Sequence, residues 1–118
     1  MENKKVTFEW KGNTYNLVFN LNVMEQIQEE YGSVGAWGDL TDNEKEPNAK
    51  AVIFGLTCMI NEGIDIDNED NEGVEGYIPK KPLTLKQVGR LLTDVGLAEA
   101  TDKLNKTVIN SIESDEKN

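Results

Sequence analysis

Hydrophobic and polar residues alternate along the first twenty positions. Six apolar residues share this two-residue period: Val6, Phe8, Trp10, Tyr15, Leu17 and Phe19. The period predicts two half-buried β-strands. Gly12-Asn13 between them suits the two-residue loop of a β-hairpin. With that loop, Trp10 faces Tyr15, Phe8 faces Leu17 and Val6 faces Phe19, so one face of the hairpin is wholly apolar. We expect this face to cover the core.

The pattern then changes to a helical period. Met24, Ile27 and Tyr31 lie on one face of a short helix. Asn22 is placed as its N-cap, with Glu25 completing a capping box, and Gly32 suits the position after its last turn.

Residues 32–48 carry no sustained period and predict an irregular segment. Thr41 to Glu44 has the pattern of a capping box for a single turn, and Pro47 suits the first turn of the next helix. Trp37 is predicted to be either a lid on the core, which is the favoured interpretation, or an exposed anchor.

Residues 51–60 form the only nearly continuous apolar run, Ala-Val-Ile-Phe-Gly-Leu-Thr-Cys-Met-Ile. The run is too short for a membrane span, which needs about 20 apolar residues. With its flanking residues it has the length of a helix rather than a buried strand. A helix that is apolar almost all round is a buried helix. We therefore expect it to be the central rod of one core, ending near residues 61–63.

Residues 61–76 follow with seven acidic residues, no basic residue and three glycines. Such a segment cannot bury enough apolar surface to become ordered, so it predicts a mobile loop. A calcium-binding EF-hand loop does not fit. Counted from Asp65, the sixth position is Asp70 instead of Gly; counted from Asn68, the twelfth position is Pro79 instead of Glu. No metal site is predicted.

The strongest local signal comes next. Thr84 and Gln87 form a capping box, and Leu83 with Val88 forms a hydrophobic staple. The helix that they begin has a clear apolar stripe and closes at Gly96. A last helix carries apolar residues at helical spacing: Leu97, Ala100, Leu104, Val108 and Ile112.

The predicted fold is therefore α+β and mainly helical, with an N-terminal β-hairpin packed on about four helices. We expect a single domain over residues 1–112, which includes a flexible acidic loop at 61–79, and a disordered tail at 113–118.

Composition excludes several functional classes. With 12 basic and 22 acidic residues the formal net charge is −10, which disfavours binding to nucleic acids or anionic membranes. The chain has no histidine, and its one cysteine, Cys58, lies in the apolar run, where burial makes a thiol inert. No P-loop, secretory signal or membrane span is recognisable. We expect a cytoplasmic protein that is not an enzyme and has no cofactor.

Four segments, in this order, carry a family resemblance: residues 12–20 (Gly-Asn-Thr-Tyr-Asn-Leu-Val-Phe-Asn), the short helix at 23–33 that closes in Gly-Ser, the apolar helix at 51–60, and residues 83–92. Together they resemble the tail assembly chaperones of long-tailed phages and prophages of low-GC Gram-positive bacteria. The resemblance covers residues 4–33 and 48–110. The acidic stretch 61–76 is longer than the family pattern.

The resemblance implies a non-enzymatic chaperone in the cytoplasm of the bacterial host. Such proteins bind the aggregation-prone tape-measure protein during tail morphogenesis, hold it soluble until tail tube protein polymerises around it, and are absent from the mature virion. A chaperone that loses its client to tube protein must bind weakly, through a modest apolar patch with a polar rim. Apolar residues in predicted loops are candidates for that patch: Trp37, Leu40, Tyr77 and Ile78.

Two other functional classes stay open. An acidic inhibitor or DNA mimic would use the charges of residues 62–75 against a basic protein, and its binding would fall sharply with salt. A structural virion subunit would form rings or tubes by itself. The sequence does not determine the oligomeric state.

The predicted central helix can be tested at Leu56. Leu56→Asp would place an unpaired charge in the core, which costs on the order of 3–5 kcal/mol. We expect this variant to be unfolded by circular dichroism at 25 °C. A melting curve like that of the wild type would show that residues 51–60 are not the core.

Overall fold

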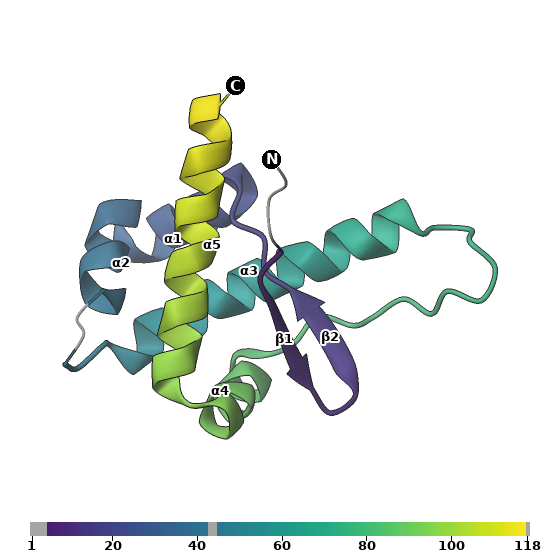
Figure 1. The fold of residues 1–118 in the computed structure, drawn as a ribbon, viewed down its shortest axis with the longest axis horizontal. Coiled ribbons are helices and arrows are strands. Elements are labelled where there is room, and N and C mark those ends of the chain that lie inside the picture. The colour runs from purple at the N-terminus through teal and green to yellow at the C-terminus, as the bar shows by residue number, and fades with distance from the viewer. Residues whose placement is uncertain (1–4, 43–44, 118) are drawn as a thin grey trace.

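The computed structural model describes residues 5–42 and 45–117, except for the side chains of 113–117. A two-stranded antiparallel hairpin is followed by five helices in the described part (Figure 1). In chain order these are β1 (Thr7–Trp10), β2 (Asn13–Asn16), α1 (Leu21–Tyr31), α2 (Val34–Thr41), α3 (Ala49–Asp70), α4 (Leu85–Val95) and α5 (Leu97–Lys117). The α+β, mainly helical class is confirmed, with one helix more than predicted.

The hairpin has the predicted apolar face but a different register. Phe8 pairs with Tyr15, and Trp10 pairs with Asn13. The turn residues are Lys11 and Gly12, both with positive φ (51° and 79°), as in a type I′ turn. The predicted Gly12-Asn13 loop was wrong because a type I′ turn favours glycine at its second position. The register shifts by two residues, an even number, so every side chain keeps its face.

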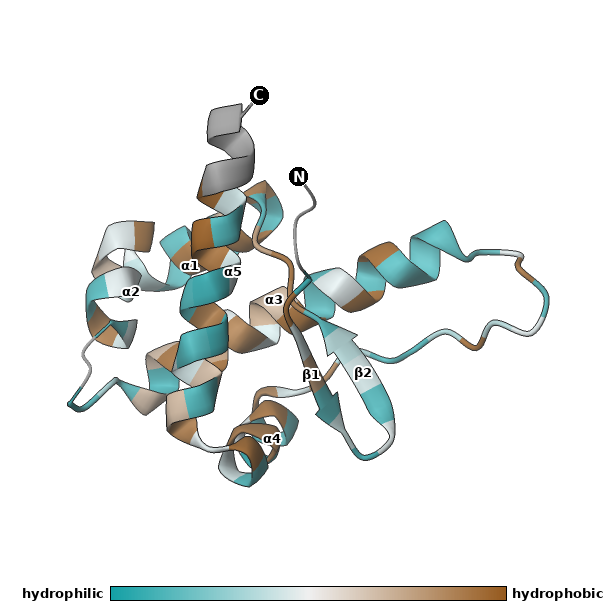
Figure 2. Cartoon of the chain, viewed as in Figure 1, coloured by the Kyte–Doolittle hydropathy of each residue, from teal (hydrophilic) through white to brown (hydrophobic). Residues whose placement is uncertain are grey.

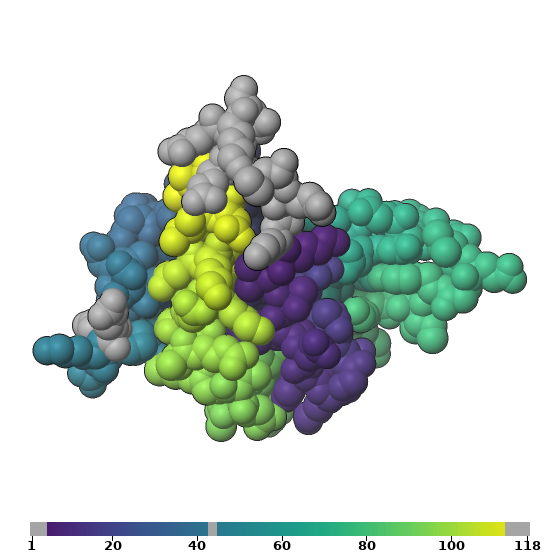
Figure 3. Space-filling model, in the orientation of Figure 1, coloured from purple at the N-terminus to yellow at the C-terminus, as the bar shows by residue number. Residues whose placement is uncertain are grey.

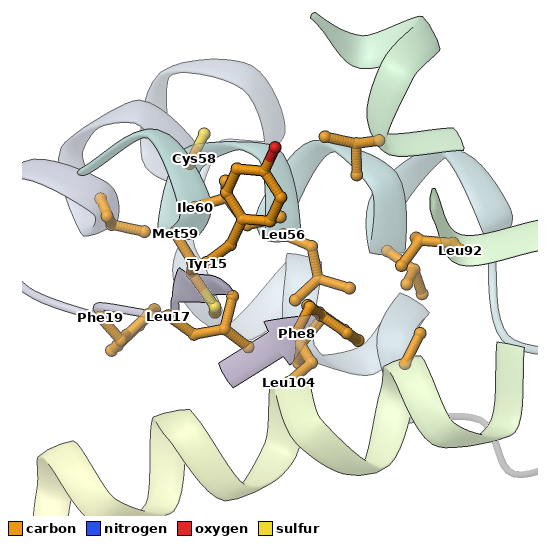
Figure 4. Packing of buried hydrophobic residues seen from close by; sticks show 14 of the residues in the cluster. Phe8, Tyr15, Leu17, Phe19, Leu56, Cys58, Met59, Ile60, Leu92 and Leu104 are labelled. Atoms are coloured by element: carbon orange, nitrogen blue, oxygen red, sulfur yellow. The ribbon is translucent and has the colours of Figure 1, made fainter. Parts of the chain in front are cut away.

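Helix α3 is the central rod, as predicted. Ten of its residues are buried, and it contacts β2 and all four other helices. Figure 4 shows Phe8 of β1 between Leu56 of α3 and Leu104 of α5. All three side chains are at most 1% exposed. The hairpin, the central helix and the last helix therefore share one core.

Two polar contacts attach the hairpin to the helices beside it. The Nε1–H of Trp10 donates to a carboxylate oxygen of Asp94 in α4 at 2.7 Å. The ammonium group of Lys103 in α5 donates to the carbonyl of Thr7 at 2.6 Å and lies 4.8 Å from the ring centroid of Phe8. An isolated two-stranded hairpin is marginal in water, so these contacts and the shared core hold it in place.

The N-terminal caps of α1 and α2 differ from the prediction. Asn20, not Asn22, caps α1, because its side-chain oxygen accepts from the N–H of Val23. Gly32 ends α1 at φ 88°, as predicted. Residues 34–41 of the segment predicted to be irregular form α2, which Ser33 caps. Two glycines in this short helix had hidden its period.

Thr41, predicted to begin a capping box with Glu44, instead lies in the last turn of α2, where its hydroxyl donates to the carbonyl of Gly38. Residues 43 and 44 of that predicted box lie outside the described residues. Pro47 precedes Asn48, which caps α3, so the proline lies just before the helix rather than in its first turn.

Helix α3 continues to Asp70, so the prediction of a loop from residue 61 was wrong for residues 61–70. Its C-terminal end and the connection to α4 project from the body as an acidic arm, residues 65–80 (Figures 2 and 3). Two asparagines of α3 hold the segment that leads back to α4 in place. Each side-chain amide donates one hydrogen bond and accepts another from the backbone of that segment. Asn61 bonds the N–H and C=O of Leu83, and Asn68 bonds those of Lys80.

The last two helices follow the prediction closely. The capping box of Thr84 and Gln87 is present, and Gly96 ends α4 at φ 96°. Helix α5 extends to Lys117, so residues 113–117, predicted to be a disordered tail, continue its backbone. None of the described helices is long and apolar enough to cross a membrane.

Two glycines let neighbouring segments approach the backbone of α3. The indole of Trp37 lies against Gly55, with its Nε1–H donating to the carbonyl of Ala51 at 2.9 Å. The backbone carbonyl of Asn16 lies against Gly63 in the same way. A Cβ on either glycine would overlap these neighbours. Both residues are thus glycine for reasons of space.

We expect Gly55→Ala to lower the free energy of unfolding by about 1–3 kcal/mol, because the added methyl group would overlap the Trp37 ring. Gly38→Ala in α2 is the matched control. No heavy atom lies within 4 Å of an added Cβ there, so the better helix propensity of alanine should add up to about 1 kcal/mol. Urea unfolding measures both. Equal effects of the two changes would contradict the close approach at Gly55.

Candidate functional site

One face of α3 stays uncovered between α1 and α4. Its lining forms two hollows of about 670 and 250 Å³, which share Phe54 and Leu85 and therefore meet there. We call the combined feature the α3 groove. Eight α3 residues at spacings of three and four form its floor: Lys50, Ile53, Phe54, Thr57, Cys58, Asn61, Glu62 and Asp65. This spacing is that of one helix face.

Aromatic and aliphatic side chains make the middle of the groove apolar. Leu85, the first residue of α4, is 53% exposed although it is large and hydrophobic. Phe54 and Ile53 are half-buried beside it. The ring of Tyr31 packs edge-on against Phe54, with centroids 5.6 Å apart. This contact holds Phe54 at the floor of the groove.

Two titratable groups lie under this floor. Burial raises the pKa of the Cys58 thiol to about 11. Burial, with a smaller effect from Glu30, also raises the pKa of Tyr31. The Tyr31 hydroxyl is the one buried side-chain polar atom in the described part of the chain that has no hydrogen-bond partner. Both groups stay neutral at pH 7, so neither adds a charge to the apolar middle of the groove.

Charged residues surround the apolar middle. Lys50, Lys86 and Arg90 line the larger hollow together with Glu30, and Glu62 and Asp65 line the smaller one. The groove therefore combines an apolar floor with a charged rim, which is the arrangement of a site that binds an amphipathic segment.

A third hollow, of about 440 Å³, lies between α2 and α5. Its lining includes Val34, Val108 and Ile109, with Asp39 and Asp42 at its edge. It is smaller than the α3 groove, and both of its charged lining residues are acidic. The α3 groove has charged residues of both signs and can therefore make more specific contacts, so it is the stronger candidate.

The structure does not bring the four sequence-predicted binding residues together. Trp37 is 2% exposed and belongs to the core, so its assignment as a partner-binding residue was wrong. Leu40 is 38% exposed on α2, whereas Ile78 is 82% exposed on the arm at the opposite end of the molecule (Figure 1). Tyr77 is half-buried and donates its hydroxyl to Asn68 at 2.7 Å.

The residues that make up the groove had weak signals in the sequence. Phe54 belonged to a helix that is apolar nearly all round, which indicated burial on every side. Leu85 comes three and seven positions before the buried residues Val88 and Leu92, so its helical spacing indicated burial with them. Its exposure at the first position of α4 is evident only in the folded structure.

The α3 groove offers both apolar and polar groups for contact. Its lining supplies apolar surface, the amides of Gln26 and Asn61, and charged groups of both signs. Among the described residues, no three His, Cys, Asp or Glu side chains gather closely enough to hold a metal ion.

Comparison with known proteins adds no family. No protein-family model matches the chain, and neither curated proteins nor solved structures provide a match.

Burial of Cys58 has a measurable consequence. Its pKa of about 11 means that alkylation by iodoacetamide should rise with pH to a midpoint near 11 in the folded protein. In urea the midpoint should fall to about 8.5, the value for an exposed thiol. Because the folded-state pKa is the higher one, this thiol stabilises the fold below pH 8.5 and loses that contribution as pH rises toward 11. A folded-state midpoint near 8.5 would show an exposed thiol.

Proposed function

We propose that this protein is a non-enzymatic tail assembly chaperone that binds the tape-measure protein of a long-tailed phage or prophage. The family resemblance motivates the proposal, and the α3 groove is the observation that carries it. A half-exposed leucine and a half-buried phenylalanine in a helical groove offer apolar contact to a segment that would otherwise aggregate.

The groove suits a transient interaction. Its two hollows have the volume of a few side chains, which corresponds to an interface at the small end of the range for specific complexes. A chaperone must release its client when tube protein polymerises, so weak contacts at several positions along the client serve it better than one tight contact. In this proposal the protein acts in the host cytoplasm and leaves before the virion is complete.

The proposal is tested by co-expression with the tape-measure protein of the same phage or prophage, followed by a pull-down at moderate salt. We expect the tape-measure protein to become soluble and to co-purify. Leu85→Asp should reduce its recovery by about tenfold or more, because a charge at the centre of the groove opposes apolar contact. Leu85 is 53% exposed, so the fold should persist.

Two other exposed apolar residues provide controls. Leu21→Asp changes a residue that is 78% exposed outside the groove, and recovery should stay at the wild-type level. Ile78→Asp tests the binding residue predicted from sequence on the arm. A loss with Ile78→Asp alone would assign binding to the arm instead. If the tape-measure protein stays insoluble with the folded wild-type chain, the chaperone function is wrong.

One observation favours a second candidate, an acidic inhibitor of a basic protein. The acidic residues Asp65, Asp67, Glu69 and Asp70 lie on the ordered end of α3, where their spacing is fixed by a helix. Binding through these charges should collapse between low and physiological ionic strength, whereas binding through apolar contact should change little.

A further inference from the structure

The charges around the α3 groove are separated by sign along its length. Lys50, Lys86 and Arg90 lie at one end, and Glu62 and Asp65 lie at the other. We infer that the groove takes an amphipathic helical segment whose acidic residues gather toward one end and whose basic residues gather toward the other. This inference rests on the proposed function and specifies which kind of client segment the protein selects.

The basic end is unusual in a chain with a net charge of −10. Lys50, Lys86 and Arg90 are all exposed, and none forms an ion pair or hydrogen bond with another described residue. Glu30 is the one acidic residue that lines this end, which leaves an excess of two positive charges. The N-terminus of α3, beside Lys50, adds positive potential from the helix dipole. These cations are therefore available to an acidic partner.

The acidic end is held in a fixed position. The carboxylate of Glu62 accepts from the side-chain amides of Asn20 at 2.8 Å and Asn22 at 3.0 Å, both at the start of α1. Asp65 follows on the next turn of α3 and is exposed. Because Glu62 is anchored, a basic residue of the client meets a charge that needs little ordering on binding.

The length of the groove determines the length of the client helix. Lys50 and Asp65 are fifteen positions apart on α3, which corresponds to about 22 Å at 1.5 Å per residue. A client of about 15 helical residues spans this distance. Its apolar residues at spacings of three and four meet Phe54 and Leu85 in the middle. Its acidic end lies beside Lys50 and Arg90, and its basic end lies beside Glu62 and Asp65.

Two synthetic peptides of about 18 residues provide the probe. Both carry the same apolar stripe and the same composition, but one has its Glu and Lys residues grouped at opposite ends and the other has them interleaved. At about 50 mM salt, fluorescence anisotropy should show the grouped peptide binding about tenfold more tightly, which corresponds to two favourable charge contacts. The difference should shrink at 500 mM salt.

Charge variants locate the effect. Lys50→Glu combined with Arg90→Glu should remove the preference for the grouped peptide. Lys5→Glu combined with Lys81→Glu makes the same change in net charge at exposed positions outside the groove and should keep the preference. A nitroxide label on the acidic end of the peptide should broaden the amide resonances of Lys50 and Arg90, and a label on the basic end should broaden those of Glu62 and Asp65.

Equal affinity for the two peptides, or label effects at the opposite ends, would overturn the inference. Its failure is distinct from failure of the chaperone function. If the tape-measure protein co-purifies equally with the wild type and the Lys50→Glu, Arg90→Glu variant, only the charge inference is wrong. If the grouped peptide is preferred but the tape-measure protein is not bound, only the identity of the client is wrong.

Discussion

The structure depends on the bare backbone of α3 at Gly55 and Gly63. At these positions Trp37 and the end of the hairpin come closer to the helix than any side chain would allow. The N–H of Val18 also donates to the carbonyl of Met59 at 3.3 Å, so the chain leaving the hairpin lies directly on the helix. Because α2 and the hairpin take up two sides of α3 in this way, its remaining exposed surface is concentrated between α1 and α4.

The groove follows from the way α1 and α4 pack on α3. Each of the two helices contacts α3, and the strip of α3 between them is left uncovered. The strip includes apolar residues because the buried turns of α3 lie beside it: Phe54 and Cys58 alternate with the fully buried Leu56 and Met59. The α3 groove is thus continuous with the core.

Local signals predicted the parts of the fold that depend on local contacts. The alternation in the hairpin, the capping box at Thr84 and the glycines that end α1 and α4 each specify geometry through neighbours within a few residues. The length of α3 was not predictable in this way. Gly63 carries the signal of a helix end, because glycine has a low helix propensity, but its role is to admit the carbonyl of Asn16. That contact joins residues far apart in the sequence.

The candidate site also depends on contacts between residues far apart in the sequence, which local signals do not predict. The sequence allowed Trp37 to be a surface anchor. In the structure its indole lies against Gly55 and stacks on the ring of Phe19, with ring centroids 6.3 Å apart. The groove residues Lys50, Glu62 and Arg90 are ordinary exposed charges in the sequence, and only the packing of α1 and α4 against α3 assembles them around one apolar strip.

The location of those charges also bears on how an acidic protein would bind the acidic end of the proposed client. At physiological salt the Debye length is about 8 Å, so the distant carboxylates of the arm are largely screened from the basic end of the groove. The cations that line the groove would act within that distance, on a client in contact with Phe54 and Leu85. Net repulsion therefore disfavours non-specific association over most of the surface, while local attraction favours one segment in one orientation. In the proposed interaction, the high negative charge of the protein and the basic end of the α3 groove would together make binding selective and reversible.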